Sequence, residues 1–166
     1  MATISVTPKS EILPGNDVIE GEVFIAAPRE RVFQAIIDPK QAMQWWGSCE
    51  AYAHQEFNMD VRPGGKWSTK GASAKTKGTF SVSGEYLEID PPRRLIYTWA
   101  SNSMPTTTKV AWHLEELEGG TLIKLRHTGF AGDAEQANNH NKGWTTVLGW
   151  LQSYCERGET VSSRKQ

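Results

Sequence analysis

Histidine and large aromatic side chains are the residues of this sequence that could do chemistry or hold an organic ligand. His127 continues an alternating pattern with Ile123 and Leu125, and His140 stands one helical turn before Trp144. A neutral imidazole can donate or accept a hydrogen bond, and it can act as a base when its pKa is near neutral. Two interpretations stay open for both histidines: a structural hydrogen bond in the core, or contact with a bound molecule.

Large aromatic side chains are frequent in this sequence, which holds 7 Trp, 5 Phe and 4 Tyr. Rings with a polar tip suit a mostly apolar pocket that has a few placed hydrogen-bonding groups. The alternative is that these rings only fill a core, as most buried aromatic side chains do. The residues that we expect to contact a ligand are Trp46, Tyr97, Trp99, Trp112, His127, His140, Trp144 and Leu148.

Metal and nucleophilic chemistry find little support in the spacing of the other polar residues. The 4 histidines show no H-x-H or H-x-x-x-H spacing, so we expect no metal site, and no motif calls for a cofactor. Ser83 lies in SVSGE rather than in the G-x-S-x-G pattern of an activated serine. Cys155 fits a small buried apolar residue. The sequence therefore names no catalytic residue.

The charge of the chain argues against two classes of partner. With 18 basic and 19 acidic residues the formal net charge is −1, and no long basic run could bind nucleic acid or an acidic membrane surface. No apolar stretch approaches the roughly 20 residues that span a bilayer, and the first residues lack a secretory signal pattern. Cys49 and Cys155 lie outside any C-x-x-C pair, so we expect two free thiols and a cytoplasmic location.

The elements that must position the candidate residues follow from the spacing of apolar residues. Alternation from residue 18 predicts a strand, followed by two short helices over residues 28–37 and 40–46. Residues 51–130 predict strands separated by turns, and three of these strands have one apolar and one polar face. Asp133 and Gly158 bound a predicted helix of about 24 residues with an apolar stripe along one side.

One domain with two short tails is the expected organisation of the 166 residues. We expect a flexible N-terminal extension over residues 1–16, a folded domain over residues 17–158 and a polar C-terminal tail over residues 159–166. The apolar stripe of the long helix must be buried, and the apolar face of the strands is the candidate surface. A curled sheet around a rod leaves a wedge of space that stiff rings close incompletely, so we expect a cavity there.

Six stretches in this order resemble the family of activators of heat shock protein 90 ATPase homologues, within the START-like (SRPBCC, birch-pollen-allergen-like) helix-grip superfamily. They are VFIAAPRERVFQAIIDPK, QWWG, RPGGKW, GEYLEIDPPRRLIYTW, VAWHLEELEGGTLIKLRHTGF and GWTTVLGWL. The likeness covers about residues 18–158. It implies an α+β helix-grip fold, in which a curved seven-stranded antiparallel sheet wraps around a long C-terminal helix, with two short helices after the first strand.

The resemblance implies three hypotheses for function. The first is binding of an apolar or aromatic small molecule in a cavity between the sheet and the long helix. The second is an enzyme of cyclase or hydrolase type that uses His127 or His140 as acid or base. The third is a co-chaperone-like partner of a heat-shock ATPase, which the missing partner-binding domain of the eukaryotic activators weakens. A homodimer is expected if an edge strand or an exposed Trp150 meets its copy.

Overall fold

A nine-stranded antiparallel sheet and three helices make up the part of the chain that the structure describes. The structure is a computed structural model and describes residues 7–48, 51–73, 78–102, 104 and 106–164, so Cys49 lies outside the described residues. The elements in chain order are β1 (Lys9–Ile12), β2 (Val18–Ile25), α1 (Arg29–Ile37), α2 (Pro39–Trp45), β3 (Gly47–Ser48), β4 (Tyr52–Met59), β5 (Lys66–Ser73), β6 (Thr79–Asp90), β7 (Arg94–Ser101), β8 (Thr108–Leu117), β9 (Gly120–Thr128) and α3 (Ala134–Arg157).

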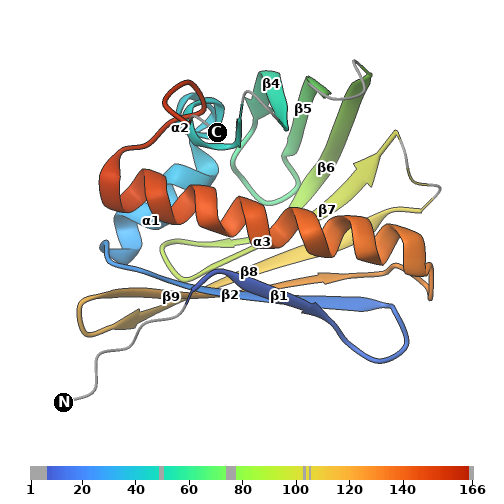
Figure 1. Ribbon diagram of the computed structural model, residues 1–166, viewed down its shortest axis with the longest axis horizontal. Helices are drawn as coiled ribbons and strands as arrows, with labels where there is room; N and C mark the ends of the chain where they lie inside the picture. The colour runs from blue at the N-terminus through green and yellow to red at the C-terminus, as the bar shows by residue number, and fades with distance from the viewer. Residues whose placement is uncertain (1–6, 49–50, 74–77, 103, 105, 165–166) are drawn as a thin grey trace.

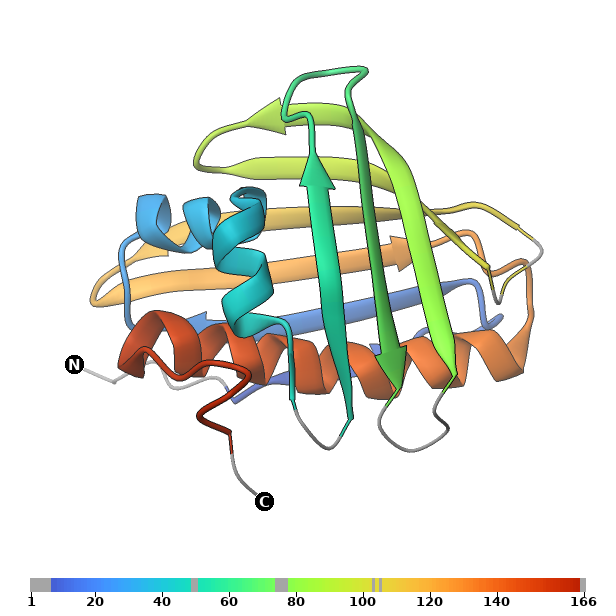
Figure 2. The same cartoon turned by 90° about the horizontal axis from the view of Figure 1, so that it is seen from above.

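Helix α3 lies along the concave side of the sheet, roughly parallel to β2 and β9, while β4, β5 and β6 run across its direction (Figures 1 and 2). Its ends are the predicted ones. The carboxylate of Asp133 accepts a 3.2 Å hydrogen bond from the backbone N–H of Gln136, and Gly158 ends the helix with a φ of 70°. The expected α+β helix-grip arrangement is therefore confirmed.

The strands follow the order β1-β2-β9-β8-β7-β6-β5-β4-β3, and the sheet bends where their register shifts. Pairing between β6 and β7 shifts between Tyr86 and Glu88, which leaves Leu87 as an extra residue with 46% of its surface exposed. A second shift lies between His54 and Glu56, where β4 pairs with β5. An extra residue on one strand bends it and increases its twist. The bulges lie where the sheet bends, so that β4, β5 and β6 run across the direction of α3.

Close approach of β6 to β7 depends on Gly84. A Cβ at this position would lie 1.9 Å from the carbonyl oxygen of Thr98 and 2.5 Å from Nε1 of Trp67. Because glycine lacks that atom, the indole N–H of Trp67 can reach over β6 and donate a 3.2 Å hydrogen bond to the same carbonyl. The tight contact holds Trp67 against the inner side of the bend.

The strand count differs from the expected seven because two short strands extend the sheet at its edges. Strand β1 pairs with β2 from Lys9 opposite Glu22 to Ile12 opposite Ile19, and β3 adds two residues beside β4. The expectation of a flexible extension over residues 1–16 is therefore wrong for residues 9–12. Four residues are too few to show a period in the sequence, and their order comes from pairing with a distant strand.

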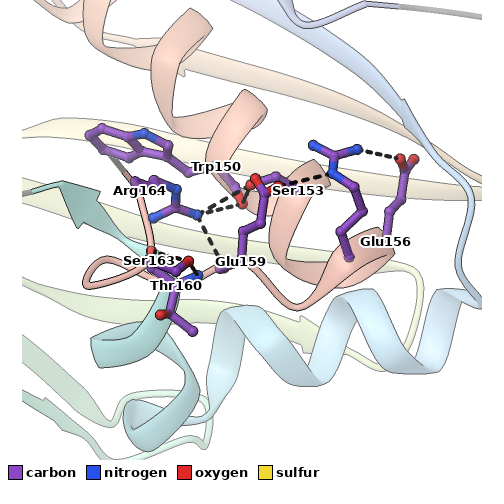
Figure 3. A network of polar contacts seen from close by, with 8 residues as sticks. Trp150, Ser153, Glu156, Glu159, Thr160, Ser163 and Arg164 are labelled. Atoms are coloured by element: carbon purple, nitrogen blue, oxygen red, sulfur yellow. Dashed lines mark hydrogen bonds and ion pairs between the residues drawn. The ribbon is translucent and has the colours of Figure 1, made fainter. Parts of the chain in front are cut away.

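The described part of the expected polar C-terminal tail, residues 159–164, packs on the rest of the protein. Figure 3 shows Arg164 beside Trp150. The guanidinium of Arg164 donates to the carbonyl oxygens of Trp45 at 2.6 Å, Gly47 at 2.8 Å and Trp150 at 3.0 Å. The carbonyl of Trp45 lies at the end of α2, where backbone acceptors have no partner within the helix, and that of Gly47 lies in β3. Trp150, expected to be exposed, is half-buried because Arg164 and Tyr52 cover it.

Candidate functional site

A cavity of about 250 Å³ lies between α3 and the bent half of the sheet. Strands β4, β5, β6 and β7 form most of its wall, and residues from α1 and α3 and the end of α2 complete it. Nine large aromatic side chains lie in this wall: Trp46, Tyr52, Phe57, Trp67, Phe80, Tyr86, Tyr97, Trp99 and Trp144. No Lys, Arg, Asp or Glu is among the described residues that line the cavity, so the space has no formal charge at its surface when its histidines are neutral.

Five of the eight predicted ligand-contacting residues lie in this wall. Strand β7 contributes Tyr97 and Trp99, α3 contributes His140 and Trp144, and Trp46 follows the last residue of α2. The rings of Trp46 and Trp144 are 6.0 Å apart between centroids, and those of Trp99 and Trp144 are also 6.0 Å apart. The structure thus brings residues from three distant segments into one continuous aromatic surface.

The other three predicted residues, Trp112, His127 and Leu148, lie in the core and do not reach the cavity. Trp112 is fully buried, and its indole N–H donates a 2.9 Å hydrogen bond to the hydroxyl of Tyr97. Leu148 packs over Gly21, where an added Cβ would come within 3.1 Å of a Leu148 methyl group. All three side chains point to the predicted inner face of their strand or helix. They lie at positions along that element where the core, and not the cavity, is on the inner side.

His127 has both ring nitrogens occupied by protein groups. The hydroxyl of Thr108 donates to the carbonyl oxygen of Trp99 at 3.2 Å, so its oxygen accepts from Nε2–H of His127 at 2.6 Å. Nδ1 accepts a 3.0 Å hydrogen bond from the indole N–H of Trp144. Burial, and next to it the nearby His140, hold the pKa of His127 well below its usual value. This histidine is neutral and has no free nitrogen for a ligand, as the structural interpretation requires.

His140 differs from His127 because one of its ring nitrogens remains available. Its Nδ1–H donates a 2.8 Å hydrogen bond to the carbonyl oxygen of Gln136, one turn earlier in α3. Burial lowers the pKa of His140, and the bond to Gln136 opposes that shift in part. The neutral ring therefore offers Nε2 as an acceptor on a side chain that lines the cavity.

Strand β4 supplies cavity residues that the sequence pattern did not identify: Tyr52, His54, Phe57 and Met59. The bulge at Gln55 separates the first two from the last two, so the inward positions change from even to odd numbers along the strand. A strict period of two assigns these four residues to opposite faces. Only the pairing with β5 shows that they share one face.

Burial keeps the polar groups of the wall uncharged. It raises the pKa of Tyr52 to about 12, although the 3.0 Å hydrogen bond from the indole N–H of Trp46 opposes the shift. It lowers the pKa of His54 to about 3 and raises the pKa of the Tyr97 hydroxyl. Two buried polar atoms in this wall, Nε2 of His54 and Nε1 of Trp99, have no hydrogen-bond partner among the described residues.

Other kinds of site have less support. Within the described ranges, no group of three or more His, Cys, Asp or Glu side chains is arranged to hold a metal ion. Cys155 is a free cysteine, and burial raises the pKa of its thiol to about 11, which disfavours the reactive thiolate. None of the helices in the described part of the chain has both the length and the apolar character needed to span a membrane.

Comparisons with known proteins agree on one fold. CV1439 from Chromobacterium violaceum is 25% identical, with a TM-score of 0.77 over 84% of this chain and 97% of its own. Ms6760 from Mycobacterium smegmatis is 17% identical, with a TM-score of 0.78 over 90% of this chain and 96% of its own. DynU16, a protein in the dynemicin biosynthetic locus, is 20% identical, with a TM-score of 0.70 over 90% of this chain and 50% of its own.

A search among proteins of curated function found no match. The family model described as "Activator of Hsp90 ATPase homolog 1-like protein" matches residues 26–156, which begin directly after β2 and include α1, α2, all later strands and almost all of α3. Since this match covers most of the sequence, the chain belongs to the family of Activator of Hsp90 ATPase homolog 1-like proteins.

Proposed function

We propose that this protein binds an apolar or aromatic small molecule in the cavity between α3 and the bent sheet. The observation that carries the proposal is a space of about 250 Å³ with an aromatic wall and no charged side chain. A protein cavity of about 150 Å³ lined by apolar side chains accommodates benzene. The larger space here therefore suits a molecule of about two fused rings.

Two further observations support a binding role over the alternatives. The rings of the wall are fixed by contacts behind them, such as the bond between Trp144 and His127, so the cavity is preformed. DynU16, which has the same fold, is a protein in the dynemicin biosynthetic locus. For the enzyme hypothesis, His127 has no free nitrogen, and burial lowers the pKa of His140, which weakens it as a base.

The test uses naphthalene as the probe and a variant that fills the cavity. Gly143 lines the cavity from α3, and a Cβ added there meets no atom within 4 Å, so Gly143→Leu can place its side chain in the space. Thr146→Leu adds the same side chain at an exposed position of the same helix and is the matched control.

We expect naphthalene to quench tryptophan fluorescence of the unmodified protein in a saturable way, because Trp46, Trp99 and Trp144 line the space. Gly143→Leu should weaken binding at least tenfold, and Thr146→Leu should leave it unchanged. Titration calorimetry gives the affinities independently of the fluorescence. Equal binding by Gly143→Leu and the unmodified protein would move the site elsewhere, and no binding of naphthalene by any of the three proteins would refute the proposal for ligands of this size.

A further inference from the structure

The environment of His54 fixes which of its ring nitrogens carries the proton. The hydroxyl of Thr69 donates a 2.9 Å hydrogen bond to the carbonyl oxygen of Glu56. That hydroxyl has no second hydrogen, so its oxygen must accept from Nδ1 of His54, with which it is in contact. The proton of the neutral ring is therefore on Nδ1, and Nε2 carries a free lone pair.

The lone pair of Nε2 lies in a buried and aromatic part of the cavity wall. Nε2 is buried and has no partner among the described residues. Aromatic rings surround His54, with centroid distances of 4.4 Å to Phe57, 5.1 Å to Phe80, 5.6 Å to Tyr52 and 5.8 Å to Trp46. A buried acceptor without a donor costs free energy that a bound molecule can recover. The protein leaves that donor to be supplied from the cavity.

The charge of a matching molecule follows from the rest of the wall. The residues that line the cavity include no Lys, Arg, Asp or Glu within the described chain, and burial disfavours protonation of His54. A charged ligand would lose its hydration without gaining an ion pair, which is costly in a low-dielectric site. A neutral hydroxyl or N–H group is therefore favoured over an ammonium group as the donor.

We infer that the ligand of this cavity is an uncharged aromatic molecule with a hydroxyl or N–H group that donates a hydrogen bond to Nε2 of His54. This inference rests on the proposed function and adds the polarity of the ligand to it. His54 accepts a hydrogen bond from the ligand. Thr69 is a positioning residue that keeps His54 in the tautomer with an unprotonated Nε2.

The first experiment compares 2-naphthol with 2-methylnaphthalene, which differ by a hydroxyl in place of a methyl group of similar size. Calorimetry measures the ratio of their association constants in the unmodified protein and in His54→Phe, which keeps a ring but loses the acceptor. We expect the ratio to fall about tenfold in His54→Phe, the effect of one hydrogen bond to an otherwise unpaired buried acceptor. His113→Phe, at an exposed position outside the cavity, is the control and should keep the ratio.

A second measurement needs no variant at His54. Nitrogen-15 NMR of the unmodified protein distinguishes a protonated from an unprotonated ring nitrogen by its chemical shift. We expect Nδ1 of His54 to be protonated and Nε2 to be unprotonated, and we expect 2-naphthol, but not 2-methylnaphthalene, to shift the Nε2 resonance. A proton on Nε2 in the free protein would overturn the inference.

The outcomes separate this inference from the proposed function. If both naphthalenes bind and His54→Phe leaves their ratio unchanged, the cavity binds aromatic molecules but His54 does not select a donor. If neither binds to the unmodified protein, the proposed function fails and the inference fails with it. A fall in the ratio together with the shift of Nε2 supports both.

Discussion

The indole N–H of Trp144 on α3 donates a 3.0 Å hydrogen bond to Nδ1 of His127 on β9. His127 is fully buried, and only 3% of the surface of Trp144 is exposed. Trp144 also forms part of the cavity wall. The bond therefore joins the long helix to the sheet and fixes from behind a ring that faces the proposed ligand. His127 is a positioning residue of the cavity rather than a part of its surface.

Stability should depend on pH through the buried histidines. Burial lowers the pKa of His54, His127 and His140 in the folded protein, so below about pH 6.5 the unfolded chain binds more protons than the folded one. Their stabilising contribution is fully present above that pH and is lost as the pH falls. Each histidine should lower the free energy of unfolding by up to about 1.4 kcal/mol per pH unit below pH 6.5.

Urea unfolding at pH 7, 6 and 5 measures this dependence. In His127→Gln the free energy of unfolding should change less with pH, because one histidine that takes up a proton on unfolding has been removed. His113→Gln, which changes an exposed histidine outside the cavity, is measured beside it for comparison. Identical slopes for His127→Gln and the unmodified protein would contradict the prediction.

Tyr97→Phe should destabilise the protein although it removes only one oxygen atom. That hydroxyl accepts the hydrogen bond from the indole N–H of Trp112, which would be left fully buried without an acceptor. The expected loss is about 1–3 kcal/mol in the free energy of unfolding, measured with urea. Tyr86→Phe is the matched control, since the Tyr86 hydroxyl makes no hydrogen bond with the described residues, and its effect should be clearly smaller. Equal losses would show that the bond to Trp112 contributes nothing.

Gly143→Ala should stabilise the protein. Gly143 is inside α3, where alanine is favoured over glycine by about 1 kcal/mol, and the added Cβ meets no atom within 4 Å. We expect a rise in Tm of about 2–4 °C, measured by circular dichroism. Gly84→Ala is the opposite case, because its Cβ would overlap the carbonyl oxygen of Thr98, and it should lower Tm. A lower Tm for Gly143→Ala would mean that this side of α3 has no room.

Arg164→Ala should loosen the attachment of the C-terminal segment. The guanidinium donates to the carbonyl oxygens of Trp45, Gly47 and Trp150, so its removal should cost about 1–2 kcal/mol in the free energy of unfolding. Arg164→Lys should recover little, since an ammonium group cannot span the same acceptors. Arg157→Ala removes an exposed arginine with surface ion pairs and should have little effect. Similar urea curves for Arg164→Ala and Arg157→Ala would contradict this role.

The long helix and strands β2, β7, β8 and β9 could be predicted because their signals are local, whereas the expected number of seven strands followed from the family resemblance. The side chain of Asp133 caps the backbone N–H of Gln136 three residues later, and Gly158 adopts the left-handed conformation expected at a helix end. The alternating residues of β7, β8 and β9 identify the buried face of each strand. Strand β1 escaped prediction because its four residues are ordered by β2, and the packing of Arg164 because its guanidinium donates to backbone groups far away in sequence.

The candidate site could be predicted only in part, as Trp99 and Trp112 show. Both rings stand at inward positions of neighbouring strands, yet Trp99 lines the cavity and Trp112 fills the core behind it. His54 shows the complementary case, because the bulge at Gln55 changes the inward face of β4. No pattern in the sequence marks either distinction.

By itself the sequence determined the helices and strands, the apolar face of each and the aromatic side chains available for a cavity wall. Backbone conformation and hydrophobic periodicity depend on neighbours along the chain. Tertiary structure alone decided which rings border the cavity and which nitrogen of His54 is left free. Those choices depend on where the sheet bends, how α3 packs across it and which hydroxyl, that of Thr69, faces the ring from another strand.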